Sequence, residues 1–446
     1  MSFEPVIASN NIVEKYKRYL KTIFDISDEN YRKQFVKELE NQNTFAAGPY
    51  LDVTDSFVKG KSIMNLIDEG ILAKSFCKVK MPLERPLYKH QEEAVIKSVN
   101  GNNIVVSTGT GSGKTESFLI PIFNHIIREY EAGTLGPGVR ALLIYPMNAL
   151  ANDQVERLRD LLENFPQITF GSYTGQTKHR FREALAEYKS LNNGQVPMKN
   201  ELISRDQIKA TPPHILITNY AMLEYLMLRP DDSVFFSSEY ADKWKYIVLD
   251  EAHVYNGSTG IEVSMLLRRV KAMLNNNNIQ YVLTSATLGG DKDNKDVAHF
   301  ACNLCDADFK ESDVIRAKRI KHVNIEEKYE LGHEFYDYIY RMIDEGLSED
   351  IICAEIKSRF GINESNLNLS TLLYHVVLHD KIYWDIKRLL QKPRTVESLA
   401  ASLGWSSQSI SNFVTVASKC DLDGDKLFDS RYHMFLKATD GVYITL

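Results

Sequence analysis

The sequence predicts an α/β protein in which a parallel sheet, covered by helices on both faces, is flanked by two mostly helical segments. From residue 81 to residue 310, short apolar runs alternate with segments of helical periodicity, the pattern of a parallel sheet with crossover helices. The run Tyr246–Leu249 is apolar at every position, as is typical of a central strand buried on both faces. A glycine-rich turn at residues 107–115 joins a strand-like run to a helix-like segment, which is also typical of this class.

The flanking segments carry apolar side chains at helical spacing. Residues 1–80 are expected to form a helical brace, with Tyr16 and Leu20 as examples of the spacing. Residues 311–446 are expected to form a second, mostly helical domain. Inside the sheet region, the polar stretch 191–209 has no strong periodicity and is expected to be a surface insertion.

The last part of the chain has the outline of a winged helix. Residues 396–403, the glycine Gly404 and residues 406–417 predict a helix, a tight turn and a second helix. Between residues 432 and 446, two alternating stretches on either side of Asp440-Gly441 predict a hairpin.

Composition limits the class of protein. The chain has 446 residues, of which 44% are hydrophobic and 25% charged, and a net charge of −6, so any nucleic-acid footprint must be local. No apolar stretch long enough for a membrane span and no secretory leader is present. Five cysteines without a signal sequence fit a cytoplasmic location. Cys302 and Cys305 lie on an expected helix, and we interpret them as packing residues.

The glycine-rich turn predicts a phosphate-binding loop. It follows the strand-like run 103–106 and precedes the helix-like segment 116–131, so its N–H groups turn inward beside a positive helix end. Lys114 is expected to reach the β and γ phosphates of a nucleoside triphosphate, and the Thr115 hydroxyl to hold Mg²⁺. The expected binding residues are Thr108, Gly109, Thr110, Gly111, Ser112, Gly113, Lys114 and Thr115. Thr108 stands where the usual pattern has its first glycine.

A second motif, Asp-Glu-Ala-His, follows the run Tyr246–Leu249. Asp250, at the carboxyl end of the expected strand, is predicted to hold the Mg²⁺. Glu251 is predicted to orient and polarise the attacking water. His253 completes the motif and is placed with Lys114, Asp250 and Glu251 in the expected reaction centre.

A third expected strand, residues 280–284, delivers Ser285-Ala286-Thr287. Ser285 and Thr287 are small hydroxyl residues that could hydrogen-bond to the loop of the acidic motif and report the state of the nucleotide to the rest of the domain. An ordinary strand end would be the alternative if the other two motifs were absent.

With these motifs in this order, the chain resembles the superfamily 2 helicases of DEAD/DEAH-box type, in particular bacterial DNA helicases with a helical domain between two motor lobes. The matching segments are Arg85–Gln91, the phosphate loop, Tyr145–Gln154, Tyr173–Gly175, Ile217–Tyr220, Asp250–His253 and Ser285–Thr287. The similarity covers residues 11 to 446 and is dense in motifs from 85 to 287. It implies that residues 81–310 form a P-loop, RecA-like first lobe.

The resemblance also implies which residues meet the ligands. Gln91, with Tyr88 nearby, would read the adenine. The groove for a nucleic-acid backbone would be lined by Pro146, Ala149, Gly175, Thr218 and Asn219. A groove at this place is expected on physical grounds too, because the segments after successive parallel strands gather at the carboxyl edge of the sheet. Backbone N–H groups there position a strand without reading its sequence.

Two further features bear on nucleic-acid contacts. Basic residues follow Gly175, but acidic residues are interspersed, so a charged groove and a solvated helix face both stay open. The basic residues are Lys178, His179, Arg180 and Arg182. At the start of the second helix of the helix-turn-helix, only Gln408 and Asn412 could read bases. We therefore expect that segment to be structural or strand-separating.

The family hydrolyses ATP with a second RecA-like lobe, whose arginines stabilise charge on the transferring phosphate. No Gln-x-x-Gly-Arg-x-Gly-Arg-like segment occurs in the 446 residues. We expect the second lobe in a longer protein or in a partner. The isolated chain is expected to hydrolyse ATP slowly, since an arginine finger is worth about 10³ to 10⁵ in turnover.

The sequence thus predicts the ATP-binding first lobe of an ATP-dependent helicase or translocase that acts on DNA. One alternative is an RNA helicase or remodelling ATPase of the same superfamily, because backbone contacts distinguish the two nucleic acids only at the 2′-OH. The other is an ATP-gated nucleic-acid-binding module without unwinding.

Overall fold

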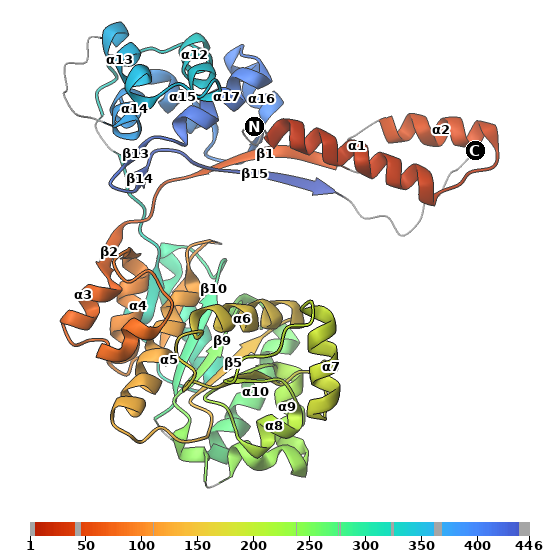
Figure 1. Ribbon diagram of the computed structural model, residues 1–446, viewed down its shortest axis with the longest axis vertical. Coiled ribbons are helices and arrows are strands. Elements are labelled where there is room, and N and C mark those ends of the chain that lie inside the picture. The colour runs from red at the N-terminus through yellow and green to blue at the C-terminus, as the bar shows by residue number, and fades with distance from the viewer. Residues whose placement is uncertain are drawn as a thin grey trace. The chain divides into compact units, whose positions relative to one another are not determined.

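The computed structural model describes residues 5–40, 46–109, 111–237, 239–274, 276, 278–322, 325–360 and 368–436. The chain divides into two compact units, one of residues 57–318 and one of residues 1–56 with 319–446. Figure 1 draws the helices and strands of both units. Each unit has hydrophobic cores of its own.

Residues 57–318 form an α/β unit around an eight-stranded sheet whose order is β11-β4-β10-β9-β5-β8-β6-β7. Every pairing within it is parallel, which confirms the predicted fold class. The strands are β4 (Ile104–Ser107), β5 (Ala141–Tyr145), β6 (Phe170–Ser172), β7 (Glu201–Leu202), β8 (Ile215–Asn219), β9 (Tyr246–Leu249), β10 (Gln280–Ser285) and β11 (Val314–Arg316). A separate antiparallel pair consists of β2 (Lys59–Ser62) and β3 (Pro86–Tyr88).

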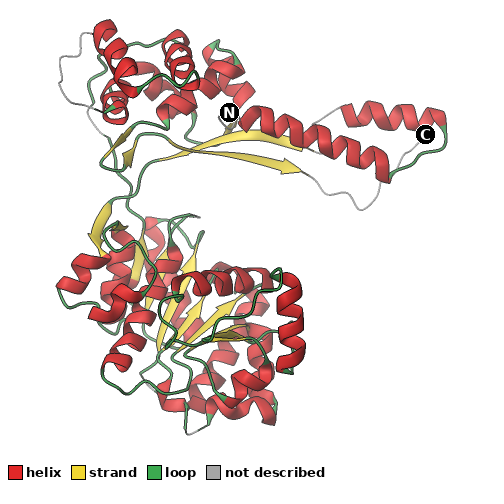
Figure 2. Cartoon of the chain, in the orientation of Figure 1, coloured by secondary structure: helices red, strands yellow, loops and turns green. Residues whose placement is uncertain are grey.

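Helices cover both faces of this sheet (Figure 2). The helices of this unit are α3 (Ile63–Asp68), α4 (Lys89–Val99), α5 (Lys114–Glu131), α6 (Asn148–Leu161), α7 (Phe181–Leu191), α8 (Arg205–Ala210), α9 (Tyr220–Leu228), α10 (Gly257–Leu274) and α11 (Asn294–Cys305). Alternate residues of one strand enter different cores: Ile104 and Val106 pack with α4 to α6, and Val105 packs with α9 to α11. Burial on both faces is the physical reason that the central strands are apolar at every position.

The bounds of this unit differ from the expected 81–310. Residues 57–80 pack with the sheet instead of forming part of an N-terminal brace, since Leu66 and Phe76 are buried in the same core as α4 to α6. At the other end, β11 lies beyond residue 310 and pairs with β4. A strand of three residues is too short for its alternation to be seen in the sequence.

The stretch 191–209, expected to be a surface insertion, contributes to the sheet in its second half. β7 pairs with β6 as an edge strand, and α8 follows it. Asn200, Glu201, Ser204 and Arg205 are all buried despite their polarity. Hydrogen bonding allows polar side chains to be buried, and a polar stretch can therefore conceal an edge strand.

Residues 1–56 and 319–446 form a mostly helical unit with a small antiparallel sheet of order β12-β1-β15. The helices are α1 (Pro5–Ile23), α2 (Glu29–Glu40), α12 (His333–Asp344), α13 (Glu349–Phe360), α14 (Leu369–Leu378), α15 (Lys381–Leu389), α16 (Val396–Leu403) and α17 (Ser407–Ala417). The strands are β1 (Ala46–Thr54), β12 (Arg394–Thr395), β15 (Asp429–Leu436) and the short pair β13 (Asp421–Leu422) and β14 (Asp425–Lys426). β1 corrects the expectation that the N-terminal segment is helical throughout.

The predicted helix-turn-helix is present in this unit. α16 ends where Gly404 adopts a left-handed φ of 68°, and the side chain of Ser406 caps α17 by accepting the Ser409 N–H. β12 and β15 flank β1 next to these helices. Residues 437–446, which include the second arm of the predicted hairpin, lie outside the described residues.

Two smaller features complete the description. Cys305, the last residue of α11, is buried in the core, and Cys302 Sγ accepts the Phe309 N–H at 3.3 Å, so both cysteines pack within the protein. In the part of the chain that the structure describes, no helix combines the length and the apolar character that crossing a lipid bilayer requires.

Candidate nucleotide-binding and nucleic-acid sites

Three neighbouring strands bring the predicted motifs together. β10 lies between β4 and β9, with Ser285 beside Ser107 and Leu283 beside Leu249 in the parallel register. Because parallel strands end at the same edge of a sheet, the glycine loop, the acidic motif and the Ser-Ala-Thr segment are adjacent.

The glycine loop has a backbone that suits glycine alone. Gly111 and Gly113 have φ values of 75° and 71°, in the left-handed region where other side chains are strained. A Cβ on Gly113 would lie 2.3 Å from Gln91 Nε2. Gly113 directly precedes α5, so the first N–H groups of that helix are available to a ligand at the loop. The Thr108 N–H donates to Ser285 O at 3.0 Å and ties the loop to β10.

Side chains within the loop bond to one another. Thr108 Oγ1 and Ser112 Oγ are 2.6 Å apart, and Ser112 is fully buried, so these two hydroxyls hold the shape of the loop. Gly109 faces open space, with no heavy atom within 4 Å of where its Cβ would lie. Thr110 lies outside the described residues.

Lys114 lies next to the acidic pair Asp250 and Glu251. Lys114 Nζ donates to Glu251 Oε1 at 3.2 Å, and the two side chains are 11% and 24% exposed. The Asp250 carboxylate accepts a hydrogen bond from the Thr284 hydroxyl. Burial raises the pKa of Asp250, while the hydrogen bond from Thr284 opposes that rise. Glu251 has a φ of 50°, a left-handed backbone conformation that is strained for a residue other than glycine.

Ser285 touches both motifs. Its carbonyl accepts the Thr108 N–H, and its Oγ lies 3.1 Å from His253 Nδ1. His253 Nδ1 is also 3.2 Å from Glu251 Oε2, so His253 connects Ser285 to the acidic pair. Thr287 is exposed and reaches Ser285 Oγ through its backbone N–H at 3.2 Å. A role for these residues in reporting nucleotide state stays a prediction.

Thr284 is a site residue that the sequence analysis missed. Its hydroxyl holds down the pKa of Asp250, so Thr284→Val should leave more of that carboxyl protonated as the pH falls. We expect Mg²⁺-dependent ATP affinity to fall about tenfold at pH 6 and less at pH 8. Titration of ATP at both pH values, with and without Mg²⁺, measures this. The control is Thr415→Val, which removes a hydroxyl bonded to Ser411 O. An equal loss of ATP affinity at pH 6 and pH 8 in Thr284→Val would contradict the explanation.

Helix α4 packs against the glycine loop through two side chains. His90 Nε2 lies 2.9 Å from Ser112 O, and Gln91 Nε2 donates to Gly113 O at 2.9 Å. Gln91 Oε1 accepts the Tyr88 N–H at 2.8 Å, so both ends of the buried Gln91 amide bond within the protein. Tyr88 stacks on His90 with ring centres 5.7 Å apart. Adenine recognition by Gln91 and Tyr88 stays a prediction, whereas the contact of α4 with the loop is present.

The residues at this edge fit a nucleoside triphosphate with a divalent cation. The left-handed glycines and the start of α5 form a cradle of N–H groups for phosphate oxygens. Asp250 and Thr115 offer oxygen ligands on adjacent segments. Mg²⁺ in such sites is typically held by one or two carboxylates together with the phosphates of the substrate, so this donor set is sufficient.

Arg316 of β11 is a second residue that the sequence analysis missed. Its guanidinium donates to Ser107 Oγ at 2.8 Å and to the carbonyl oxygens of Leu288, Gly289 and Gly290 at 2.7–2.9 Å. It therefore fastens the segment after Ser-Ala-Thr to Ser107 at the end of β4. A single arginine on a three-residue strand gives no signal in the sequence.

Some residues expected to line the nucleic-acid groove lie at the starts of helices. Pro146 lies between β5 and α6, and Ala149 is the second residue of α6 and is exposed. Asn219 caps α9 with its side-chain oxygen, and its Nδ2 donates to Asn148 Oδ1 at 2.9 Å. The segments after β5 and β8 are thereby linked at the same edge of the sheet.

Of the other two residues, Gly175 belongs to the segment after β6, and Thr218, in β8, contacts that segment. Thr218 is fully buried and donates to Tyr173 O at 2.7 Å, so its side chain supports that segment from below the surface. Gly175 is exposed. Lys178, beyond it, forms an ion pair with Glu187 at 3.2 Å, with both side chains nearly half exposed, which favours the solvated helix face over a charged groove at this pair.

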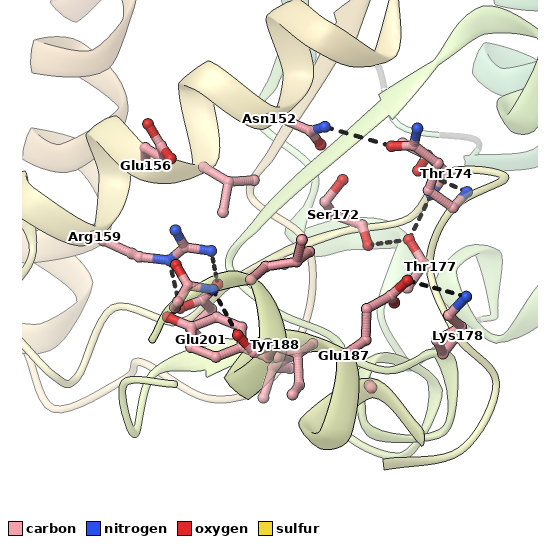
Figure 3. Close-up of a pocket in the computed structure, with 18 residues that line it drawn as sticks. Asn152, Glu156, Arg159, Ser172, Thr174, Thr177, Lys178, Glu187, Tyr188 and Glu201 are labelled. Carbon is pink, nitrogen blue, oxygen red and sulfur yellow. Dashed lines mark hydrogen bonds and ion pairs between the residues drawn. The ribbon is translucent and has the colours of Figure 1, made fainter. Parts of the chain in front are cut away.

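A cavity of about 570 Å³ opens between α6, α7 and the segment after β6 (Figure 3). Two ion pairs lie in its wall: Arg159 holds Glu201 with two hydrogen bonds of 2.8 Å, and Lys178 pairs with Glu187. Its lining includes no residue of the glycine loop or the acidic motif, so it is separate from the nucleotide site.

One central strand is followed by a glycine loop with Lys-Thr, and a nearby strand is followed by an acidic pair. This arrangement is typical of P-loop nucleotide-binding folds. The sequence profile of the DEAD/DEAH box helicase family matches residues 88–295. Residues 88–295, somewhat under half of the chain, are therefore similar to the DEAD/DEAH box helicases.

Curated relatives extend this similarity. The chain is 28% identical over 403 residues to the Druantia protein DruE of Escherichia coli (strain UMEA 4076-1), covering 69% of this chain and 22% of DruE. It is 30% identical over 207 residues to the ATP-dependent helicase hrq1 of Schizosaccharomyces pombe, covering 45% of this chain and 16% of hrq1. The chain thus spans about a fifth of the length of these relatives. A crystal structure of the DUF1998 helicase MrfA bound to DNA has a TM-score of 0.44 and 20% identity, covering 63% of this chain and 31% of that chain.

Proposed function

We propose that this chain is the ATP-binding first motor lobe of an ATP-dependent helicase or translocase that acts on DNA. The observation that carries the proposal is the 3.2 Å contact between Lys114 Nζ and Glu251 Oε1, two residues 137 positions apart in the sequence. It brings the lysine of the phosphate loop to the carboxylate that would prepare water for attack. The choice of DNA follows the resemblance of the motifs to those of bacterial DNA helicases.

Each residue of the site has a distinct task in this proposal. Lys114 exchanges its contact with Glu251 for oxygens of the β and γ phosphates. Glu251, released from the lysine, orients the attacking water and accepts its proton. Thr115 and Asp250 hold Mg²⁺, which neutralises charge on the phosphates when it is bound. Burial of Asp250 disfavours its charged form, so a bound cation is its natural partner.

We further propose that turnover needs a second RecA-like lobe, in the same polypeptide or in a partner. The arginine-bearing segment of such a lobe does not occur in the 446 residues, and its contribution to turnover is about 10³ to 10⁵. The 446-residue chain by itself should therefore bind ATP with Mg²⁺ but hydrolyse it slowly. Brisk DNA-stimulated phosphate release by the purified chain would contradict this part of the proposal.

A competition experiment tests the choice of DNA. A labelled single strand of DNA is bound to the chain with a non-hydrolysable ATP analogue, and unlabelled DNA and RNA of identical sequence are used as competitors. DNA should displace the label at a concentration about tenfold or more below that of RNA. Equal or better displacement by RNA would favour the alternative of an RNA-remodelling ATPase.

The helix-turn-helix is proposed to be structural. Asn412 Nδ2 and Ser409 Oγ donate to the two carboxylate oxygens of Asp337 at 2.7 and 3.0 Å, and Gln408 Nε2 donates to Asn412 Oδ1 at 3.1 Å. The polar side chains at the start of α17 therefore form hydrogen bonds with α12 and with each other, and we propose that they do not contact bases.

Replacing Gln408 and Asn412 together by alanine should leave DNA affinity within about twofold of wild type. The same variant should lower the melting temperature of this unit, because Asp337 loses a hydrogen-bond donor. Fluorescence anisotropy with labelled DNA and thermal unfolding measure the two effects. A loss of DNA affinity of about tenfold would show that these side chains read bases.

A further inference from the structure

In the segment that follows β6, the first residues are held by the protein and Gly175 is exposed. Tyr173 and Thr174 are buried, whereas Gly175 is exposed. The Gly175 N–H donates no hydrogen bond to any described residue, and a Cβ on Gly175 would meet no heavy atom within 4 Å. A free N–H in open space at the carboxyl edge of a parallel sheet is well placed to donate to a phosphate oxygen.

Neighbouring elements hold the base of this segment through Tyr173. The Tyr173 N–H donates to Ile217 O at 2.8 Å, and Thr218 Oγ1 donates to Tyr173 O at 2.7 Å. The phenol of Tyr173 donates to Asp232 Oδ1 at 2.7 Å. The backbone and the side chain of Tyr173 are thus both fixed from within the protein.

Arg205 holds the segment from a third direction. It is the first residue of α8, in the polar stretch whose burial the sequence did not reveal. Its Nη2 donates to Thr174 O at 3.0 Å, and its Cζ lies 5.1 Å from the centre of the Tyr173 ring. Its backbone N–H donates to Lys178 O at 2.9 Å. Arg205 therefore bonds to the chain on both sides of Gly175.

The hydrogen bond to Thr174 O sets the direction of the Gly175 N–H. The two groups belong to one planar, trans peptide unit, so fixing the carbonyl toward the interior turns the N–H toward the exterior. The Thr177 N–H also donates to Thr174 O, at 3.2 Å, and Figure 3 shows Thr174 and Thr177 close together on this segment. These two donors thereby restrict the orientation of the peptide unit between Thr174 and Gly175.

Because Arg205 is buried, it can position the Thr174 carbonyl but cannot contact a nucleic-acid strand directly. Arg205 is 6% exposed, so its charge is not presented to a ligand in the groove. Its Nη1 lies 3.4 Å from His179 Nε2, and its Nε has no hydrogen-bond partner, which makes the burial costly. An apolar side chain would pack on Tyr173 at lower cost, so the donor to Thr174 O is the property that distinguishes arginine here.

We propose that Arg205 is a positioning residue for nucleic-acid binding, which fixes the Thr174 carbonyl so that the Gly175 N–H points outward to one backbone phosphate. The inference rests on the proposed function, because the ligand is a nucleic-acid strand. It gives α8 a task in the motor lobe that lies outside the motifs of the sequence.

The test is a methylphosphonate scan. Single-stranded DNA oligomers, each with one phosphate replaced by a neutral methylphosphonate, are titrated against the 446-residue chain with a non-hydrolysable ATP analogue. Wild-type protein should bind about tenfold more weakly when one particular phosphate is neutral. Arg205→Ala should bind unmodified DNA about tenfold more weakly and should lose its sensitivity to that phosphate alone. Arg205→Lys, which keeps a donor on a flexible stem, should recover part of both properties.

Two controls separate positioning from a general loss of structure. ATP affinity should be unchanged in Arg205→Ala, and Arg269→Ala, which removes an exposed arginine paired with Glu224, should behave as wild type in the scan. If Arg205→Ala also loses ATP affinity, the inference is tested with Arg205→Lys instead. Its affinity for unmodified DNA and its sensitivity to the one neutral phosphate are then compared with those of wild type.

The outcomes are distinct. An Arg205 variant that retains ATP affinity and full sensitivity to the same phosphate would overturn the inference, as would a uniform loss at every phosphate. Failure of the wild-type chain to bind any strand would instead overturn the proposed function.

Discussion

Glu251→Gln is expected to reduce ATP turnover at least about 100-fold while ATP stays bound. Glutamine keeps the size of the side chain and an oxygen for Lys114 Nζ, which lies 3.2 Å from Glu251 Oε1. It cannot accept a proton from the attacking water. The measurement is DNA-stimulated phosphate release in the assembly that includes the second motor lobe, together with retention of labelled ATP by the same sample.

The control for this variant is Glu262→Gln, which makes the same change at an exposed position of α10. It should turn ATP over at the wild-type rate. If Glu251→Gln also worked at that rate, Glu251 would have no part in hydrolysis, and the chain would be better described as an ATP-gated binding module.

Lys114→Ala is expected to weaken ATP binding at least about 30-fold. The variant loses charge-assisted hydrogen bonds to the phosphates in a site where the lysine is only 11% exposed. It also leaves the Glu251 carboxylate without its partner, close to the negative charge of ATP. Alanine is a good helix former at the start of α5, so the fold should persist. Titration with a fluorescent ATP analogue in Mg²⁺ measures the affinity.

Lys271→Ala provides the matched comparison, because it removes an ammonium that pairs with Asp306 at 3.1 Å on α10. Its ATP affinity should equal that of wild type. Equal affinity of Lys114→Ala and wild type would mean that the glycine loop does not hold the phosphates.

The central strands and the grouping of the motif residues at one edge of the sheet were predictable from the sequence because local patterns encode them. Tyr246–Leu249 is apolar at every position since its side chains enter cores on both faces of the sheet. Gly111 and Gly113 were identified by spacing, and their left-handed φ values explain why glycine stands there. The proximity of Lys114 and Glu251 then follows from parallel strands that end at one edge.

Features that depend on contacts between residues far apart in the chain could not be predicted from local sequence patterns. β1 pairs with β15 across most of the chain length, and nothing local to residues 46–54 indicates that partner. β7 and α8 are polar in sequence, yet Glu201 and Arg205 are buried because their charges meet specific partners. Thr284 resembles any strand threonine until the fold places it against Asp250.

Equilibrium dialysis against labelled ATP tests most directly whether Lys114 and Asp250 serve one triphosphate and its metal. The folded 446-residue chain should retain one ATP per molecule in Mg²⁺, and retention should fall when Mg²⁺ is chelated or when Asp250 is replaced by asparagine. If the folded wild-type chain retained no ATP, or retained it equally with and without Mg²⁺, the shared site would be contradicted.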